Sequence, residues 1–212
     1  MKMQRFTPTR KARTVLDSGM LLLLVLLFTG GPIAARWARV LHEWSGIALF
    51  AAAILHTVWN RRWYAALFRG PYSAKRTLLT VIDLALAASF LLMMVSSPLV
   101  SQHVFSFLHL HGAALGRRLH LPATAWAFLL TGFHLGLHHG GAHRKAVFLL
   151  PAAGGAAALI HLHLWERLFL LSEFVFVPNI PILVQGCEYL LILFLFAALG
   201  AEAMRCLTKN KE

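Results

Sequence analysis

Apolar residues in this chain form long continuous runs, separated by short polar segments. The runs are 18 to 25 residues long, which is too long for strands and is the length of a helix that crosses a bilayer. The apolar–polar alternation typical of strands is not visible, which argues against a sandwich or barrel. Small residues in PAAGGAAA, within the fifth run, predict close helix packing. The runs predict six helices, at about 15–33, 39–59, 77–100, 119–138, 146–165 and 183–206.

Composition supports an all-α integral membrane protein with one domain over residues 1–212. Of the 212 residues, 58% are hydrophobic and 13% are charged, and the mean hydropathy is +0.67. Such values are typical of membrane proteins and not of soluble domains. The net charge of +12 would suit nucleic acid, but the basic residues lie between apolar runs. We therefore interpret them as topology signals beside membrane lipid, and expect no nucleic acid partner.

The distribution of basic residues predicts the orientation in the membrane. With the N-terminus inside, 15 of the 20 Lys and Arg residues lie in cytoplasmic segments. The positive-inside rule then places both termini in the cytoplasm. The basic N-terminus and the first apolar run also resemble a secretory signal, but the length of the run and Asp17 near its start favour a retained helix.

Two apolar runs each carry a pair of histidines at the same spacing. His42 and His56 are fourteen residues apart, and so are His120 and His134. This spacing returns the second histidine to within about 40° of the first, about 21 Å further along the helix. The predicted topology makes the two helices parallel. It therefore pairs His42 with His120 near the outer face and His56 with His134 near the inner face.

Two imidazoles facing each other in an apolar bundle suit a b-type haem. The ligand faces also carry small residues that would admit a flat macrocycle, among them Gly46 and Ala53, while Leu49 lies midway, where a spacer between two haems would sit. Ligation by two imidazoles leaves no open iron position and suits electron transfer. No CxxCH motif is present, so covalent haem attachment is not expected. The pattern predicts two haem b groups, with quinone as a further candidate ligand.

Other interpretations of these histidines remain open. His138 lies one turn beyond His134 on the same face and competes with it as the inner ligand, although the matched rise favours His134. The HxxxH pair that they form could bind a metal, but no HExxH motif or acidic third ligand accompanies it in the sequence. All of these histidines could also be satisfied core residues, but ionisable groups at membrane depth are usually functional.

Several charged residues are candidates for supporting roles. Glu43 could orient His42, handle a quinol proton, or simply be exposed at the interface. Asp83, about two turns into its helix, could serve a proton or quinone, although a hydrogen bond between helices is favoured. Arg61 and Arg62 could pair with the propionates of the inner haem or be ordinary cytoplasmic charges.

The sequence also resembles a known family. The strings HEWSGIALFAAAILHTVWNRRWYAALFRGPYS and RRLHLPATAWAFLLTGFHLGLHHG, and the tail FLLSEFVFV followed by a last helix, resemble the flavinylation-associated cytochromes (DUF4405). The matching histidines are His42, His56, His120, His134 and His138. The chain departs from the family where His139 replaces a tryptophan and where Asp83 stands in place of a common asparagine.

This resemblance implies a multi-helix b-type cytochrome of the bacterial cytoplasmic membrane. Such proteins are thought to pass electrons between the quinone pool, or the cytoplasmic side, and extracytosolic partners that carry flavin (FMN). We therefore expect a six-helix transmembrane bundle with a haem-binding four-helix core of cytochrome b type, acting as an electron-transfer subunit of a redox system. No flavin or nucleotide motif is visible, so the flavin would belong to the partner or another redox subunit. The alternative is a haem-free transporter or interaction subunit whose histidines serve proton transfer or packing.

Overall fold

The computed structural model describes residues 8–30, 35–139, 145–171, 174–176 and 178–209, and within these ranges it contains helices and no strand. The all-helical prediction is confirmed. Each of the six predicted runs overlaps one long helix, although the ends differ by several residues because helix N-termini extend into the polar segments. The long helices are α1 (Arg10–Gly30), α2 (Arg36–Trp59), α4 (Ala74–Val100), α5 (Ala113–His139), α6 (Lys145–His161) and α8 (Ile182–Lys209); short helices are α3 (Arg61–Ala66), η1 (Ser106–Leu108) and α7 (Leu164–Leu168).

Four of the described helices, namely α1, α2, α4 and α8, are long and apolar enough to cross a membrane. This supports the prediction of a membrane protein. By the same criteria of length and composition, α5 and α6 are not among the candidate membrane-spanning helices. Helix α5 carries Arg117 and Arg118 in its second turn, and α6 has 17 residues. The two helices nevertheless pack within the bundle, since both make extensive contacts with α8.

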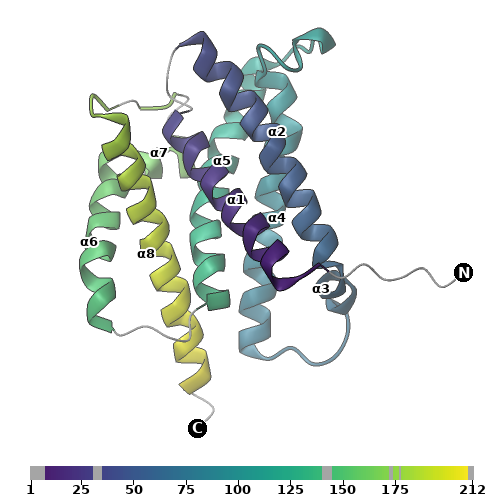
Figure 1. Ribbon diagram of the computed structural model, residues 1–212, viewed down its shortest axis with the longest axis vertical. Coiled ribbons are helices and arrows are strands. Elements are labelled where there is room, and N and C mark those ends of the chain that lie inside the picture. Colours follow the sequence, from purple (N-terminus) through teal and green to yellow (C-terminus); the bar gives the residue numbers. More distant parts are fainter. Residues whose placement is uncertain (1–7, 31–34, 140–144, 172–173, 177, 210–212) are drawn as a thin grey trace, which may run out of the picture.

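The long helices alternate in direction (Figure 1). Helices α1, α4 and α6 run upward in the view of Figure 1, and α2, α5 and α8 run downward. We call the end where α2 and α5 begin the upper end, and the end where they finish the lower end. Helices α2 and α5 are therefore parallel, as the predicted topology requires, so His42 and His120 belong to the upper end and His56 and His134 to the lower end.

The main hydrophobic core joins α1, α5 and α8. Phe28 of α1, Phe128 of α5 and Tyr189 of α8 form an aromatic group with ring centroids 4.2 to 5.6 Å apart. Phe128 and Tyr189 are fully buried. Burial of such side chains contributes about 1.5–3 kcal/mol each, so α1 is an integral part of this bundle.

Glycines allow the closest helix contacts. A Cβ atom placed on Gly136 of α5 would lie 2.0 Å from the Ala197 carbonyl oxygen of α8, and one on Gly200 would lie 2.3 Å from the Phe133 carbonyl oxygen. On α6, a Cβ on Gly155 would lie 2.4 Å from the Leu191 carbonyl oxygen. These backbones can approach only because the side chains are absent. The close packing predicted for PAAGGAAA is confirmed.

Candidate functional site

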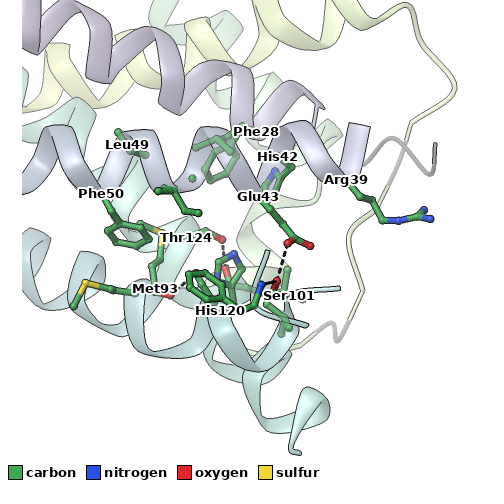
Figure 2. A pocket seen from close by; sticks show the side chains of 18 of the residues that line it. Phe28, Arg39, His42, Glu43, Leu49, Phe50, Met93, Ser101, His120 and Thr124 are labelled. Carbon is green, nitrogen blue, oxygen red and sulfur yellow. Dashed lines mark hydrogen bonds between the residues drawn. The ribbon is translucent and has the colours of Figure 1, made fainter. Parts of the chain in front are cut away.

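A cavity of about 460 Å³ opens in the upper half of the bundle. Its walls come from α1, α2, α4, α5 and α7, and both His42 and His120 line it (Figure 2). Helix α2 packs mainly against α1 and has few contacts with α4 and α5, so the cavity occupies the space between these helices. The volume lies in the range of cofactor and small-ligand sites.

The imidazole of His120 contacts a side chain of α4. Its Nδ1 lies 3.4 Å from the hydroxyl of Ser96, which is fully buried and donates to the Leu92 carbonyl oxygen at 2.8 Å. Because that hydroxyl proton is already used, Nδ1–H of His120 donates to Ser96 Oγ. This arrangement leaves Nε2 as the nitrogen with a free lone pair.

His42 lies opposite, on α2. It sits beside the Leu27 backbone of α1, and its Nδ1 is buried without a partner of good hydrogen-bond geometry in the described part of the chain. Figure 2 shows His42 and His120 reaching the same cavity from two different helices. The structure thus brings together the two residues that the sequence paired at this end.

Two arginines, Arg39 and Arg167, also line this cavity. The side chain of Arg167, from α7, is only 5% exposed, and its Nε and Nη2 atoms are buried with no hydrogen-bond partner among the described residues. Buried N–H groups of a charged side chain are costly when they lack an acceptor. The cavity therefore suits a ligand that brings an anionic group to Arg167.

The wall next to His42 is open at Gly46. A Cβ placed on Gly46 would meet no other atom within 4 Å, so this face of α2 leaves room for a flat group, as predicted. Leu49, predicted as a spacer, is 3% exposed, lines the cavity and joins the main core.

Glu43 closes the top of the cavity wall in a way that the sequence did not predict. Its carboxylate accepts hydrogen bonds from Ser101 Oγ at 2.7 Å and from the backbone N–H groups of Gln102, His103 and Val104 at 2.9, 3.2 and 2.7 Å. Glu43 therefore anchors the end of α4 to α2, and it is neither simply exposed nor bonded to His42 in any described contact.

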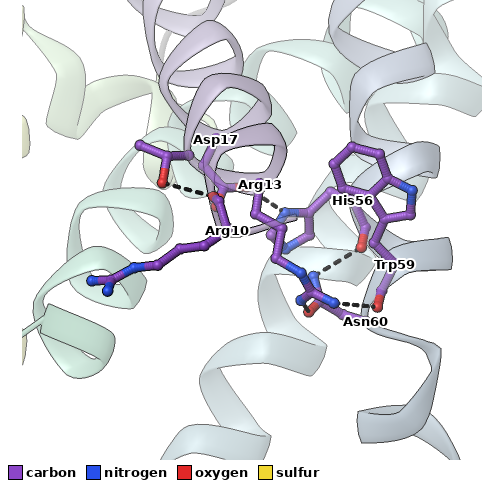
Figure 3. Close-up of polar contacts among 7 residues, drawn as sticks. Arg10, Arg13, Asp17, His56, Trp59 and Asn60 are labelled. Atoms are coloured by element: carbon purple, nitrogen blue, oxygen red, sulfur yellow. Dashed lines mark hydrogen bonds and ion pairs between the residues drawn. The ribbon is translucent and has the colours of Figure 1, made fainter. Parts of the chain in front are cut away.

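At the lower end, His56 is bound from α1 (Figure 3). Its Nδ1 lies 2.8 Å from Asp17 Oδ1. Arg13 of the same helix donates to Asn60 Oδ1 at 3.1 Å and to the Trp59 carbonyl oxygen at 3.3 Å. The first turns of α1 are thereby fixed to the end of α2.

His134 similarly contacts a carboxylate, which belongs to α4. Its Nδ1 lies 2.8 Å from Asp83 Oδ1, and Nε2 of His138 lies 3.7 Å from the same oxygen. The three residues could hold a metal ion, because one ligand atom from each lies within 4.8 Å of the others. The inference that the HxxxH pair lacks an acidic third ligand was wrong, since Asp83 comes from a helix distant in the sequence. The hydrogen bond between helices favoured for Asp83 is confirmed.

The described contacts give less support to the other residues that the sequence predicted for the lower haem site. No described interaction links His56 to His134. Arg61 and Arg62 lie on α3 and are exposed, and Arg61 makes one long contact, 3.5 Å, to the Val58 carbonyl oxygen. Their pairing with haem propionates therefore stays a prediction, and His139 lies where no side chain is described.

Sequence reasoning missed two residues of these sites. Arg167 has only a weak signal in the sequence: it follows Glu166 in the otherwise apolar stretch LWERLFLL, and an adjacent acidic residue suggests an ordinary surface pair. Asp17 was treated as an interruption of the first helix. Its partner His56 is 39 residues away, so only the packing of α1 on α2 could reveal the pair.

No family model, curated protein or solved structure matches the chain. The resemblance to flavinylation-associated cytochromes therefore stays a prediction.

Proposed function

We propose that this chain is a membrane b-type cytochrome that carries electrons across the bacterial cytoplasmic membrane. The observation that supports it best is the meeting of His42 and His120 at one cavity between α2 and α5. Two imidazoles on an apolar cavity are the ligand set of a six-coordinate haem, which supplies one-electron chemistry without an open iron position.

The residues of the upper cavity fit a haem b group. Nε2 of His120 is free for iron because Nδ1 faces Ser96, and His42 lies on the opposite wall. Gly46 leaves open space beside the ligand. Nε and Nη2 of Arg167, which are buried without a partner among the described residues, would bind a propionate, as a guanidinium binds a carboxylate.

A second haem at the lower end would be held by His56 and His134. Both imidazoles are bonded through Nδ1 to a carboxylate, Asp17 or Asp83, so each retains Nε2 for a ligand bond. Histidines that bind metals usually donate their other N–H in this way. With one haem at each end, the two sites would span the hydrocarbon core, and the chain would be a subunit of a redox system.

In this proposal all six long helices cross the membrane, with both termini in the cytoplasm. The upper end then faces the outside and the lower end the cytoplasm. The partners are the quinone pool or a cytoplasmic donor on one side and an extracytosolic protein carrying flavin (FMN) on the other. Quinone would be a further ligand of the cytochrome.

The test is the absorption spectrum of the chain purified from haem-replete cells. We expect a Soret band, sharp α-bands of b type after reduction, and two haems per chain by pyridine haemochrome assay. His42→Ala and His120→Ala should each remove the same haem, whereas His111→Ala, an exposed histidine at the same end, should remove none. A colourless wild-type preparation would contradict the proposal.

The second candidate is a haem-free membrane transporter or interaction subunit. The Asp17–His56 and Asp83–His134 pairs favour it, because carboxylate–histidine pairs at membrane depth also occur in proton paths. In that case the purified chain lacks a Soret band, and His42→Ala and Asp83→Asn change transport or partner binding without any spectral change.

A further inference from the structure

The two ends of the bundle hold their histidines differently. At the lower end, His56 and His134 each contact a carboxylate at 2.8 Å through Nδ1. At the upper end, His120 contacts the hydroxyl of Ser96 and His42 lies beside backbone of α1. Among the described contacts, neither upper histidine is bonded to a carboxylate.

This difference has an electronic consequence for any iron bound there. A carboxylate that accepts from Nδ1–H increases the electron donation of the imidazole, and hydrogen bonds of this kind tune the potential of a bound metal. Stronger donation stabilises the ferric state. The upper cavity also has a carboxylate in its wall, Glu43, but this group accepts four hydrogen bonds, from Ser101 Oγ and the backbone N–H groups of 102–104. The buried Arg167 lines the same cavity, and its positive charge stabilises the ferrous state.

Arg13 is the cation closest in sequence to Asp17, and its described hydrogen bonds are to other groups. Arg13 directs its guanidinium to Asn60 and to the Trp59 carbonyl oxygen, and no described ion pair joins it to Asp17. His138 approaches Asp83 only to 3.7 Å. Among the described residues, the only ion-pair partners of Asp17 and Asp83 are therefore histidines.

We propose that Asp17 and Asp83 are positioning residues that make the lower haem site more reducing than the upper one. The proposal rests on the proposed function and adds the order of the two potentials. In the topology given above, this order favours an electron at the outer side, and thus delivery from the cytoplasmic side to an extracytosolic acceptor.

The two aspartates should differ in strength. The side chain of Asp83 is 13% exposed and that of Asp17 is 50% exposed. Solvent screens a half-exposed charge more than a largely buried one. The contribution of Asp83 should therefore exceed that of Asp17.

The experiment is a potentiometric titration of both haems in the full-length protein. His42→Ala identifies the upper haem by its loss, and the haem content of each variant is measured in parallel. In the wild type, the lower haem should have the more negative midpoint. Asp83→Asn should shift that midpoint in the positive direction and leave the upper one in place, Asp17→Asn should produce a smaller shift of the same sign, and Asp83→Glu should restore part of the wild-type value. Glu202→Gln, at an exposed glutamate paired with Arg205, is the matched control and should shift neither.

Distinct outcomes would overturn the proposal. A lower haem with the more positive midpoint in the wild type contradicts the order of potentials. Unchanged midpoints in both Asp83→Asn and Asp17→Asn, with two haems retained, show a purely structural role. If the protein binds a single haem that depends on His42 and His120, there is no lower haem site, and this proposal fails although the chain is still a cytochrome. If the protein binds no haem, the proposed function itself is wrong. If Asp83→Asn loses the lower haem, Asp17→Asn and Asp83→Glu still measure the potential.

Discussion

Asp83 Oδ1 on α4 lies 2.8 Å from Nδ1 of His134 on α5. The same oxygen lies 3.7 Å from His138, but it faces Nε2 of that ring. The two histidines of the HxxxH pair are therefore not equivalent. No described contact occupies Nε2 of His134, whereas His138 turns Nε2 toward the carboxylate. For the proposed haem at the lower end, this relationship favours His134 as the iron ligand.

Replacement of these two histidines should separate their roles. We expect His134→Ala to remove one of two haems and His138→Ala to retain both, because only His134 is oriented with a free Nε2. Haem content per chain and reduced α-band intensity measure the outcome. If His138→Ala loses the haem and His134→Ala keeps it, His138 is the ligand. If either variant instead loses bound divalent metal, and haem content is unaffected, the Asp83 cluster is a metal site.

Gly46 offers a test of the upper cavity that leaves the histidines in place. Gly46→Leu should lower occupancy of the upper haem several-fold, because the new side chain enters space that is open in the structure. The helix itself should persist, since leucine favours helix by about 0.5–1 kcal/mol relative to glycine. Ala51→Leu, at an exposed position of α2, is the control and should bind haem normally. Equal haem content in both variants would place the ligand elsewhere.

Much of this fold could be predicted from sequence, because apolar runs of bilayer length leave few alternatives. The order of the long helices and the parallel course of α2 and α5 follow from run length and charge, whereas the short helices α3, η1 and α7 do not. The pairing of His42 with His120 at one cavity also follows, since equal spacing on parallel helices gives equal depth. These inferences use only the position of a residue along its own helix.

Contacts that depend on helix rotation could not be predicted. The sequence shows that His56 faces some neighbour, but only packing shows that the neighbour is Asp17 of α1. Similarly, Glu43 could be placed near His42, yet its bonds go to the backbone at 101–104. Arg167 was missed because a short helix after a break at His163, where φ is 50°, turns it inward.

The anchor formed by Glu43 should contribute measurably to stability. Glu43→Ala leaves the N–H groups of Gln102, His103 and Val104 without their acceptor. The loss of hydrogen bonds to a charged group should cost about 1–3 kcal/mol. Thermal unfolding in detergent and amide exchange at 102–104 measure the effect. Glu202→Ala is the control, because an exposed ion pair contributes only about 0–1 kcal/mol; equal losses in the two variants would contradict the anchoring role.

Gly136 should tolerate no side chain, because the backbones of α5 and α8 touch there. In Gly136→Ala the added Cβ would lie 2.0 Å from the Ala197 carbonyl oxygen, so the helices must separate. Overpacking of this kind costs about 1–3 kcal/mol, and it should lower the Tm in detergent. Gly19→Ala is the matched control, since a Cβ there meets nothing within 4 Å and alanine favours helix by about 0.5–1 kcal/mol. Gly136→Ala should also weaken haem binding, because α5 carries His120 and His134 and its displacement moves both. An unchanged Tm in Gly136→Ala would mean that α5 and α8 are further apart than described, and the positions of these ligands would then have to be revised.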